Sequence, residues 1–511
     1  MNRTTRDLAL AGVVTGLAGL VTSQAAVWAL QVENPPVVAV ASAVRDLTPG
    51  PLALKLIHLV KHQDKPLLVT GTVVLLLALC AWLGTMNRRR PTVVDLGYLL
   101  LAGVGLLAVM RLDDSTPGSA IAVVVGLVTW LLVNRFLSAP ILAAAEAETS
   151  GTETGSAAAR ASRRSFLRRT GGVGVGVLAA GALARFSSRH RREVEQARRL
   201  LRLPVTTGSE PTGADLGAGI EPWRTPNDEF YLIHTALVEP SIAPRDWELR
   251  VHGMVDRELT ITYSDLVGRP ITEGWVTLCC VSNEVGGDLI GNAWWSGVLV
   301  RDILAEAGVQ EGADAVLQTS HDGWNCGTPL QALTDDRNAM LALAMNGKPL
   351  PIEHGFPVRT VVPGLYGYVS ATKWLVDLEV TRFDQVDAYW TKRGWSERGP
   401  VKTQSRIDVP RDGSSVKTGR AKVGGSAWSQ HTGIEKVEFQ LDGGPWQEAE
   451  LGTVPNVDTW VQWAGEVDVA EGHHTLVVRA TDRSGKTQTS VRTDVVPDGA
   501  TGWHTVEFGA G

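Results

Sequence analysis

Cysteine is scarce in this chain of 511 residues. The sequence has four cysteines and no Cys-x-x-Cys pair, which excludes a zinc ribbon and a scaffold held together by many disulfides. A dominant charge of one sign is also missing, because 48 lysines and arginines face 54 aspartates and glutamates and leave a formal net charge of −6. That balance gives no reason to expect nucleic acid as a partner.

Long apolar runs are abundant, but only in the amino-terminal part. Leu8–Val32 carries no charge over 25 residues, which is enough to cross a hydrocarbon core of about 30 Å at about 1.5 Å per residue. Leu67–Leu83, Val93–Met110 and roughly Thr116–Val133 are similar. The sequence therefore predicts about four transmembrane helices within residues 1–140 and a chain anchored in the cell membrane.

The charges between these runs predict which way the chain crosses the membrane. If all four runs insert, the basic segments Arg3–Arg6, Arg88–Arg90 and Arg160–Arg169 fall on one side, and the acidic pair Asp113-Asp114 falls on the other. Basic residues favour the cytoplasmic side. We therefore expect a cytoplasmic amino terminus.

Residues 141–200 are predicted to contain a basic cytoplasmic linker, an export signal and a fifth apolar helix. The run Ser162-Arg163-Arg164-Ser165-Phe166-Leu167-Arg168, followed by uncharged Thr170–Ala184, resembles a twin-arginine export signal. The alternative is a basic loop before an ordinary fifth span. Either interpretation places the rest of the chain outside the cytoplasm. A twin-arginine route carries folded proteins, so it also predicts a cofactor downstream.

The pattern of residues 201–511 predicts two soluble domains. Short strand-like runs broken by Gly, Pro and Asp, with one amphipathic helix at Val300–Ala307, predict a mixed α+β domain over residues 201–399. The predicted strands are Trp247–Val251, Leu259–Tyr263, Trp275–Cys280, Val316–Thr319 and Phe356–Val362. Residues 400–511 contain strand-length segments such as Lys436–Leu441 and His474–Thr481, each before a turn, which favours an immunoglobulin-like β-sandwich. The expected fold is thus multidomain.

The pair Cys279-Cys280 ends one predicted strand and leads into Val281-Ser282-Asn283-Glu284-Val285-Gly286-Gly287. A thiolate at a strand end suits a transition metal, and glycines let backbone N–H groups approach a bulky anion closely. A buried or disulfide-bonded cysteine pair is the alternative. Composition alone leaves both open.

Three motifs in order resemble the sulfite oxidase family of molybdenum enzymes. The cysteine segment is followed by Gly291-Asn292-Ala293-Trp294-Trp295-Ser296-Gly297-Val298, and the second signature consists of the runs at 354–359, 362–367 and 371–374. The resemblance covers roughly Glu221–Gly511. It implies a molybdopterin-binding catalytic domain and a carboxy-terminal domain of the kind that this family uses for dimerisation.

The resemblance also implies a set of site residues. Cys280, three positions before Asn283 as in the family, corresponds to the molybdenum ligand, whereas Cys279 occupies a variable position. The other positions that match cofactor-contacting residues are Tyr231, His234, Thr235, Asp322, His354, Arg359, Thr372 and Lys373. By the resemblance, His354 and Arg359 hold the molybdopterin phosphate, and Thr372 and Lys373 make a nearby backbone and cation contact to it. The chemistry of Arg359 and Lys373 fits, because guanidinium and ammonium groups form charge-assisted hydrogen bonds with phosphate. Taken singly, each has a plain alternative as a turn residue or a surface ion pair.

Two departures from the family pattern bear on the substrate. Where sulfite oxidases place an arginine in the entry strand to hold the anion, this chain has Ile233, and where they carry a tyrosine near the metal it has Trp395. Losing a cationic clamp weakens the binding of a small dianion, so sulfite is a doubtful substrate. The chain carries no fused haem-binding domain, which implies a separate electron carrier.

The sequence thus predicts an extracytoplasmic molybdenum-cofactor oxidoreductase that acts on a small-molecule substrate by a two-electron, oxygen-atom-transfer type of reaction. The rival hypothesis is a membrane-tethered interaction or sensor protein that keeps the fold without the metal.

Overall fold

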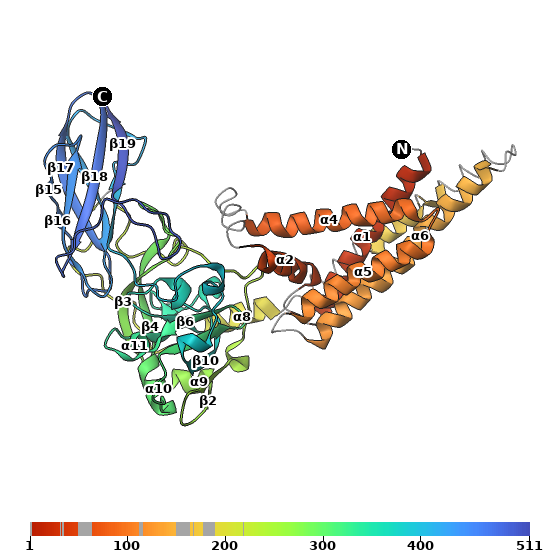
Figure 1. Cartoon of the computed structure of the whole chain (residues 1–511), viewed down its shortest axis with the longest axis horizontal. Helices are drawn as coiled ribbons and strands as arrows, with labels where there is room; N and C mark the ends of the chain where they lie inside the picture. The colour runs from red at the N-terminus through yellow and green to blue at the C-terminus, as the bar shows by residue number, and fades with distance from the viewer. Residues whose placement is uncertain are drawn as a thin grey trace. The chain divides into compact units, whose positions relative to one another are not determined.

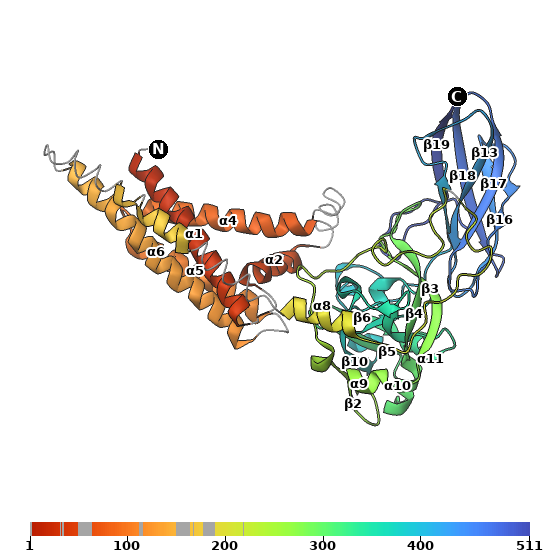
Figure 2. The same cartoon turned by 180° about the vertical axis from the view of Figure 1, so that it is seen from behind.

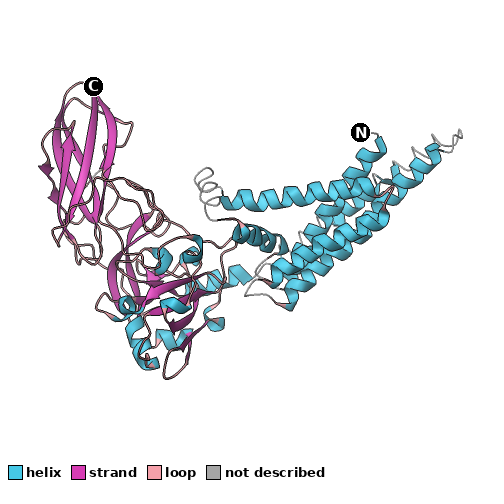
Figure 3. Cartoon of the chain, viewed as in Figure 1, coloured by secondary structure: helices cyan, strands magenta, loops and turns pink. Residues whose placement is uncertain are grey.

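A computed structural model describes residues 3–30, 32, 35–49, 64–111, 116–149, 164–166, 168–176, 190–217 and 219–511 of the chain. Contacts divide the chain into two units. The first comprises Met1–Glu193 with Ala236–Pro240, and the second comprises Val194–Thr235 with Ser241–Gly511. The described part of the first unit is helical, whereas strands dominate the second (Figure 1, Figure 2, Figure 3).

Apolar sequence explains the long helices of the first unit. They are α1 (Arg3–Ala29), α4 (Asp64–Met86), α5 (Pro91–Met110) and α6 (Pro117–Thr149), with a shorter α2 (Pro36–Leu47) between the first two. Among the described residues, four helices are long and apolar enough to cross a membrane, at Thr4–Ala29, Lys65–Met86, Pro91–Met110 and Pro117–Glu146. Large side chains such as Leu75, Leu100 and Leu132 stay exposed on them. A helix that is apolar all round is either buried or lipid-facing.

Glycines let α1 lie close against α4. A Cβ atom on Gly12 would lie 2.1 Å from the carbonyl oxygen of Cys80, and Gly84 of α4 is crowded in the same way by α1. Such small residues at helix contacts are typical of membrane bundles. A buried amide pair adds a polar contact with α6, where Nδ2 of Asn87 donates to Oδ1 of Asn134 at 2.8 Å.

Two sheets form the first part of the second unit. One has the order β2-β1-β10-β5-β6, in which β1 and β10 are parallel and the other neighbours antiparallel. Its strands are β1 (Glu248–Gly253), β2 (Leu259–Thr262), β5 (Ala315–Ser320), β6 (Asn325–Pro329) and β10 (Leu375–Thr381).

The other sheet has the order β3-β4-β7-β8, with β9 also paired to β7. Its strands are β3 (Thr272–Cys279), β4 (Ile290–Leu299), β7 (Met340–Met345), β8 (Lys348–Pro349) and β9 (Arg359–Val361). Every residue of β7 is buried, which marks it as a central strand covered on both faces. β9 therefore lies directly beside the core of this part.

Helices are short in this part, and local signals explain the two best defined. In α9 (Tyr263–Val267), Thr262 and Asp265 form a capping box. In α10 (Val300–Ala307), one face is buried and the helix stops at Gly308, whose φ is +72°. The others are α8 (His190–Leu200) and α11 (Leu330–Thr334), with 3₁₀ turns at Pro244–Asp246, Ile352–His354, Gly367–Val369, Phe383–Gln385 and Thr391–Arg393.

Two further sheets make up the carboxy-terminal part. One contains β11 (Gln404–Val409), β13 (Gly419–Trp428), β16 (Glu450–Leu451) and β17 (Val461–Val469). The other contains β12 (Ser415–Val416), β14 (Ile434–Leu441), β15 (Gln447–Glu448), β18 (Gly472–Asp482) and β19 (His504–Ala510). Their inward side chains form one core that includes Phe439, Trp463 and Phe508. The sheets therefore bury their apolar faces against each other.

The carboxy-terminal sheets also hold the edge of β3. The N–H of Thr277 donates to the carbonyl of Asp458 (3.0 Å), and the Thr277 hydroxyl accepts the N–H of Trp460 (2.8 Å). The indole of Trp460 donates to the carbonyl of Trp223 (2.9 Å). These bonds explain why the residues after 400 belong to the same unit as the two sheets that contain β1 to β10.

The observed elements can be set against those predicted. The four long apolar helices and α10 lie where the sequence places them, and each predicted strand coincides with an observed one. The prediction of a strand at Phe356–Val362 is too long, because the observed strand covers only Arg359–Val361. Of the predicted export signal, Ser162, Arg163 and Leu167 lie outside the described residues, as does the end of the predicted fifth helix beyond residue 176.

Candidate active site

Cys280 lies in the turn that follows β3, one residue beyond the end of the strand. Its N–H donates to the carbonyl of Leu289 (2.9 Å), and its carbonyl accepts the N–H of Asn283 (3.0 Å). The side-chain oxygen of Asn283 accepts the N–H of Leu289 at 2.9 Å. These bonds close the turn over residues 280–289, which we call the Cys280 turn, and they fix the direction of its side chains.

The sulfur of Cys280 is a free thiol, and so are the other three. A disulfide between Cys279 and Cys280 is therefore excluded. Cys279 is 2% exposed and its Sγ donates to the carbonyl of Cys280 at 3.5 Å. Cys280 is 8% exposed. Burial raises the pKa of its thiol, whereas donors from the backbone and hydroxyl of Ser282 and the charge of Lys373 act in the opposite direction.

Arg359 begins β9 and is a buried cation. Its side chain is 4% exposed, and it donates to the carbonyls of His354 (3.2 Å) and Thr360 (3.3 Å). The guanidinium carbon lies 5.1 Å from the ring centre of Trp295. Burial lowers the pKa of Arg359 to about 10. No carboxylate among the residues that the structure describes comes within 4.0 Å of it, so its charge lacks a counter-ion there.

His354 lies next to this cation with one ring nitrogen engaged. Its Nε2 lies 2.9 Å from the carbonyl of Asn227, so Nε2 carries the proton and Nδ1 is an acceptor. That Nδ1 is buried and has no hydrogen-bond partner among the described residues. Burial, together with the charges of Lys373 and Arg359, lowers the pKa of His354 to about 3, which keeps the ring neutral.

Lys373 approaches the same region from the segment before β10. Its Nζ donates to the carbonyl of Glu353 (2.9 Å) and lies 3.4 Å from Nδ1 of His234. The next residue, Trp374, has a φ of +51°, a conformation that a bulky side chain adopts at a cost of about 1–3 kcal/mol. Its indole N–H donates to the carbonyl of Ile352 at 2.9 Å. The strained backbone is thus tied to the 3₁₀ turn that carries His354.

The entry segment contributes Tyr231, His234 and Thr235. Burial and the nearby sulfurs of Cys280 and Cys279 raise the pKa of Tyr231, and Arg359 opposes them. Tyr231 is therefore close enough to both cysteines and to the buried cation to feel their charges. His234 stacks edge-on with Trp374 at 5.5 Å, and Thr235 is half-buried beside it in the chain.

Thr372 and Asp322 contact residues outside the set of predicted site residues. The N–H of Thr372 donates to the hydroxyl of Thr360 (2.8 Å), and its own hydroxyl lies 3.3 Å from Sγ of Cys326. Asp322 accepts the N–H of Trp324 at 3.4 Å within the turn between β5 and β6. No hydrogen bond or ion pair in the described part of the chain joins Asp322 to the other predicted site residues. The places of both in a cofactor site remain predictions.

The structure thus brings six of the predicted residues into one cluster, which we call the cation cluster with its thiol: Tyr231, His234, Cys280, His354, Arg359 and Lys373.

Two positions where the sequence departs from the family pattern lie in different surroundings. Ile233 and its neighbour Leu232 are each 44% exposed. Trp395 is 5% exposed and packs between the rings of Tyr368 (5.7 Å) and Trp390 (6.1 Å). Its indole N–H has no partner among the described residues.

Sequence reasoning missed the residues that hold the Cys280 turn from outside. Arg406 of β11 donates to the carbonyl of Gly287 (3.1 Å), to Asp408 (2.7 Å) and to Glu221 (2.8 Å). His504 of β19 packs so tightly on the turn that a Cβ on Gly286 would lie 2.1 Å from its ring nitrogen. No local pattern marks either residue, because each acts across more than one hundred positions of sequence.

The cluster fits the molybdopterin that the sequence predicts. A phosphate would supply the counter-ion that Arg359 lacks, since guanidinium and phosphate pair through charge-assisted hydrogen bonds. Because Nε2 of the neutral His354 donates to Asn227, its Nδ1 cannot donate to the phosphate as the resemblance implies, but it can accept a hydrogen bond from an N–H group of the pterin ring. The unbridged thiol of Cys280 is a soft donor suited to molybdenum. The residues present therefore match the three chemical parts of that group.

Comparisons with known proteins agree with this chemistry. Residues 235–390 match the family described as "Oxidoreductase molybdopterin binding domain". Mitochondrial sulfite oxidase of Homo sapiens is 32% identical over 276 residues, covering 45% of this chain and 50% of that protein. Sulfite oxidase of Gallus gallus is 30% identical over 319 residues, covering 52% and 68%. The uncharacterized oxidoreductase YuiH of Bacillus subtilis is 33% identical over 186 residues, covering 36% and 90%. The chain spans about half the length of the human protein.

Arg406→Gln tests the external bracing of the Cys280 turn. The substitution leaves Asp408, whose side chain is 7% exposed, buried without its cation, and breaking a buried pair costs about 3–5 kcal/mol. We expect a fall of several degrees in the unfolding temperature of the detergent-purified chain, measured by differential scanning fluorimetry. Arg420→Gln removes an exposed partner of Glu466 and should change little, as exposed pairs contribute about 0–1 kcal/mol. Equal effects of both would contradict the bracing role.

His504 predicts a pH dependence of stability. Its Nδ1 accepts the N–H of Ile407 at 2.9 Å, and burial with the charges of Arg406 and Arg492 lowers its pKa to about 4 from 6.5. The unfolded chain therefore takes up a proton before the folded chain does. This contribution to stability is complete above pH 6.5 and is lost as the pH falls towards 4. The unfolding temperature should fall less steeply over that range in His504→Asn, which keeps an acceptor but does not titrate. Parallel pH profiles would refute the assignment.

Proposed function

This chain belongs to the sulfite oxidase family of molybdopterin-dependent oxidoreductases, and we propose that it catalyses a two-electron oxygen-atom transfer on a small neutral substrate outside the cytoplasm. The observation that carries the proposal is the cation cluster with its thiol. A free sulfur, an unpaired imidazole nitrogen and a buried guanidinium without a carboxylate occur together there.

Each residue has a proposed role in holding the cofactor. Cys280 would give its thiolate to the molybdenum, and Arg359 with Lys373 would neutralise the phosphate of the pterin. His354 would accept a hydrogen bond at Nδ1. Tyr231, His234, Thr235, Asp322 and Thr372 complete the proposed set of cofactor-contacting residues. When bound, the cofactor supplies the electron pair and the oxygen-atom exchange.

The protein's own contribution is to exclude water and to hold the ligands still. Cys280, His354, Arg359 and Lys373 are each less than 9% exposed, so little water reaches these side chains. Low solvent access strengthens the charge interactions inside. The braced Cys280 turn and the strained backbone at Trp374 keep the donors in place.

The outer side of the site favours a neutral substrate over sulfite. Leu232 and Ile233 are apolar and partly exposed, and Ile233 stands where the family pattern has an arginine. A dianion would lose a charge-assisted contact there. We infer that the substrate carries an oxo group on a neutral sulfur or nitrogen, or the reduced form of such a group.

The two ends of the chain support proposals for its location and its partners. The four helices long enough to cross a membrane and the predicted export signal support a multi-pass anchor with the catalytic unit outside the cytoplasm. A separate electron carrier would exchange electrons with the site. The two carboxy-terminal sheets support an immunoglobulin-like sandwich, through which we propose that the chain forms a homodimer.

Cys280→Ser tests the metal ligand. A hydroxyl is a poor donor to molybdenum compared with a thiolate, so we expect the variant to lose most of its molybdenum by inductively coupled plasma mass spectrometry after homologous expression. Cys279→Ser is the matched control, because it removes the neighbouring buried thiol, and it should keep the metal. A parent protein without molybdenum would sink the enzyme proposal and favour the sensor hypothesis. Loss of metal from both variants alike would argue against Cys280 as the specific ligand.

Ile233→Arg tests the reason for doubting sulfite. The new guanidinium should raise kcat/KM for sulfite with ferricyanide as acceptor by roughly tenfold or more, since a hydrogen bond to a charged group contributes about 1.5–3 kcal/mol. Leu232→Arg places the same charge on a neighbour of equal exposure, 44%, and separates a specific clamp from general attraction of the anion. An equal gain in both variants, or none in either, contradicts the role given to position 233.

A further inference from the structure

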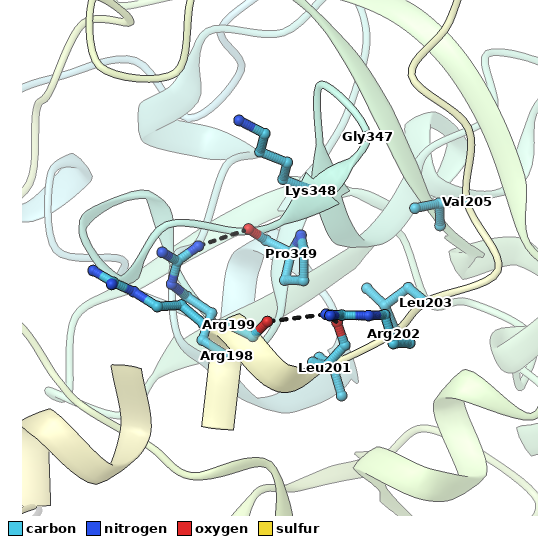
Figure 4. A pocket seen from close by; sticks show the side chains of 9 residues that line it. All are labelled: Arg198, Arg199, Leu201, Arg202, Leu203, Val205, Gly347, Lys348 and Pro349. Carbon is cyan, nitrogen blue, oxygen red and sulfur yellow. Dashed lines mark hydrogen bonds between the residues drawn. The ribbon is translucent and has the colours of Figure 1, made fainter. Parts of the chain in front are cut away.

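A basic hollow lies at the carboxyl end of α8, within the second unit (Figure 4). Its volume is about 350 Å³, and it is lined by the end of α8, the segment that follows and the turn between β7 and β8. Its charged lining residues are Arg198, Arg199, Arg202 and Lys348. None of them belongs to the proposed cofactor site.

Positive charge exceeds negative charge in this hollow. Glu195 accepts from Arg198 at 2.7 Å and from Arg199 at 2.8 Å, and the bond from Arg198 is the main cause that lowers its pKa to about 2. Arg202 donates to the carbonyls of Arg199 and Leu201. Glu353 acts on Arg198 only through space. Among the described residues, four cations therefore face the paired carboxylate of Glu195 and the more distant one of Glu353.

Apolar side chains border the same hollow. Leu201, Leu203, Val205 and Pro349 form part of its wall. Leu200, the last residue of α8, is 74% exposed and lies in the chain between Arg199 and Arg202. Arginines beside an exposed leucine at the end of an amphipathic helix are the composition of a segment that lies at a membrane interface.

The chain itself limits how far the hollow can be from a membrane. The uncharged run that follows the predicted export signal ends at Ala184, and α8 begins six positions later at His190. Even a fully extended connection and the length of the helix up to Arg198 together reach only about 33 Å. If Ala184 is at the bilayer surface, the hollow stays within that radius.

We propose that this hollow binds the phosphodiester headgroup of an anionic lipid on the side of the membrane where the catalytic unit lies. The arginines would pair with the phosphate oxygens and Lys348 would add a point charge, while Leu200 would enter the acyl boundary. The proposal rests on the membrane anchoring in the proposed function. Bound there, the lipid would hold the catalytic unit at the bilayer in one orientation, in addition to the tether.

The test uses the full chain in dodecyl maltoside, titrated with dioctanoyl phosphatidylglycerol and read by native mass spectrometry. The variant R199Q/R202Q/K348Q removes exposed charges and leaves Arg198 in place, because Arg198 also bonds to Glu195 and to the carbonyl of Pro349. We expect its apparent Kd for the lipid to rise at least about tenfold. The matched control K417Q/R420Q/K422Q removes three exposed charges from the carboxy-terminal sheets and should bind like the parent.

Three comparisons decide the outcome. Dioctanoyl phosphatidylcholine should bind the parent and the hollow variant alike, which would show that the negative headgroup matters. Competition by inorganic phosphate or by a polyglutamate peptide at concentrations equal to the lipid would overturn the proposal in favour of a free anion or an acidic protein. Equal binding of phosphatidylglycerol by the parent and the hollow variant would also overturn it.

Molybdenum content, measured on the same preparations, separates this proposal from the proposed function. The hollow variant should keep the parent's metal. A parent without metal defeats the proposed function and leaves lipid binding to be judged by the titration, whereas a metal-loaded parent that does not bind phosphatidylglycerol defeats the lipid site alone.

Discussion

The candidate active site depends on the buried guanidinium of Arg359, which is almost entirely shielded from water. Arg359 is 4% exposed, and among the residues that the structure describes its side chain bonds only to backbone carbonyls. A buried charge without a partner costs several kcal/mol, and carbonyl dipoles and the ring of Trp295 offset only part of that. The phosphate of the proposed cofactor would offset the rest. Because β9 pairs with the fully buried β7, Arg359 cannot move out to solvent without opening the core, so the fold and the need for an anionic ligand are linked.

The Cys280 turn depends on a second buried charge, one that does have partners. Arg406, with a side chain 4% exposed, bonds to Asp408, Glu221 and the carbonyl of Gly287. A buried pair of this kind adds little net stability, but it tolerates few alternative arrangements. It therefore fixes the position of the turn more than it strengthens the fold. The carboxy-terminal sheets, which supply Arg406 and His504, are in this sense part of the candidate site.

Sequence patterns could predict those elements whose signal is local. Uncharged runs give α1, α4, α5 and α6, and the apolar face with its terminal Gly308 gives α10. The sequence could not predict β4, because glycine, asparagine and serine interrupt it although nine of its residues are buried. The apolar Phe356 and Val358 made β9 look longer than it is, whereas Pro357, which has no N–H to donate, argues against a strand there. At the site, the positions of Cys280, His354 and Arg359 came from a family resemblance. The contacts of Arg406 and His504 with the Cys280 turn could not be predicted from the sequence, since they depend on tertiary packing between distant segments.

Charge is divided unevenly between the inner and outer sides of the site. The cations Arg359 and Lys373 and the neutral His354 are buried, where the phosphate of the proposed cofactor would balance their charge, whereas the uncharged Leu232 and Ile233 of the entry segment are each 44% exposed. An enzyme that also had to hold a dianionic substrate would need a further cation near the metal, and that cation would compete for the same phosphate in a region of low solvent access. A neutral substrate avoids this competition. For the neutral substrate that we propose, affinity would come from shape and apolar contact, which would place selectivity in the residues around position 233 and not in the chemistry of the cofactor.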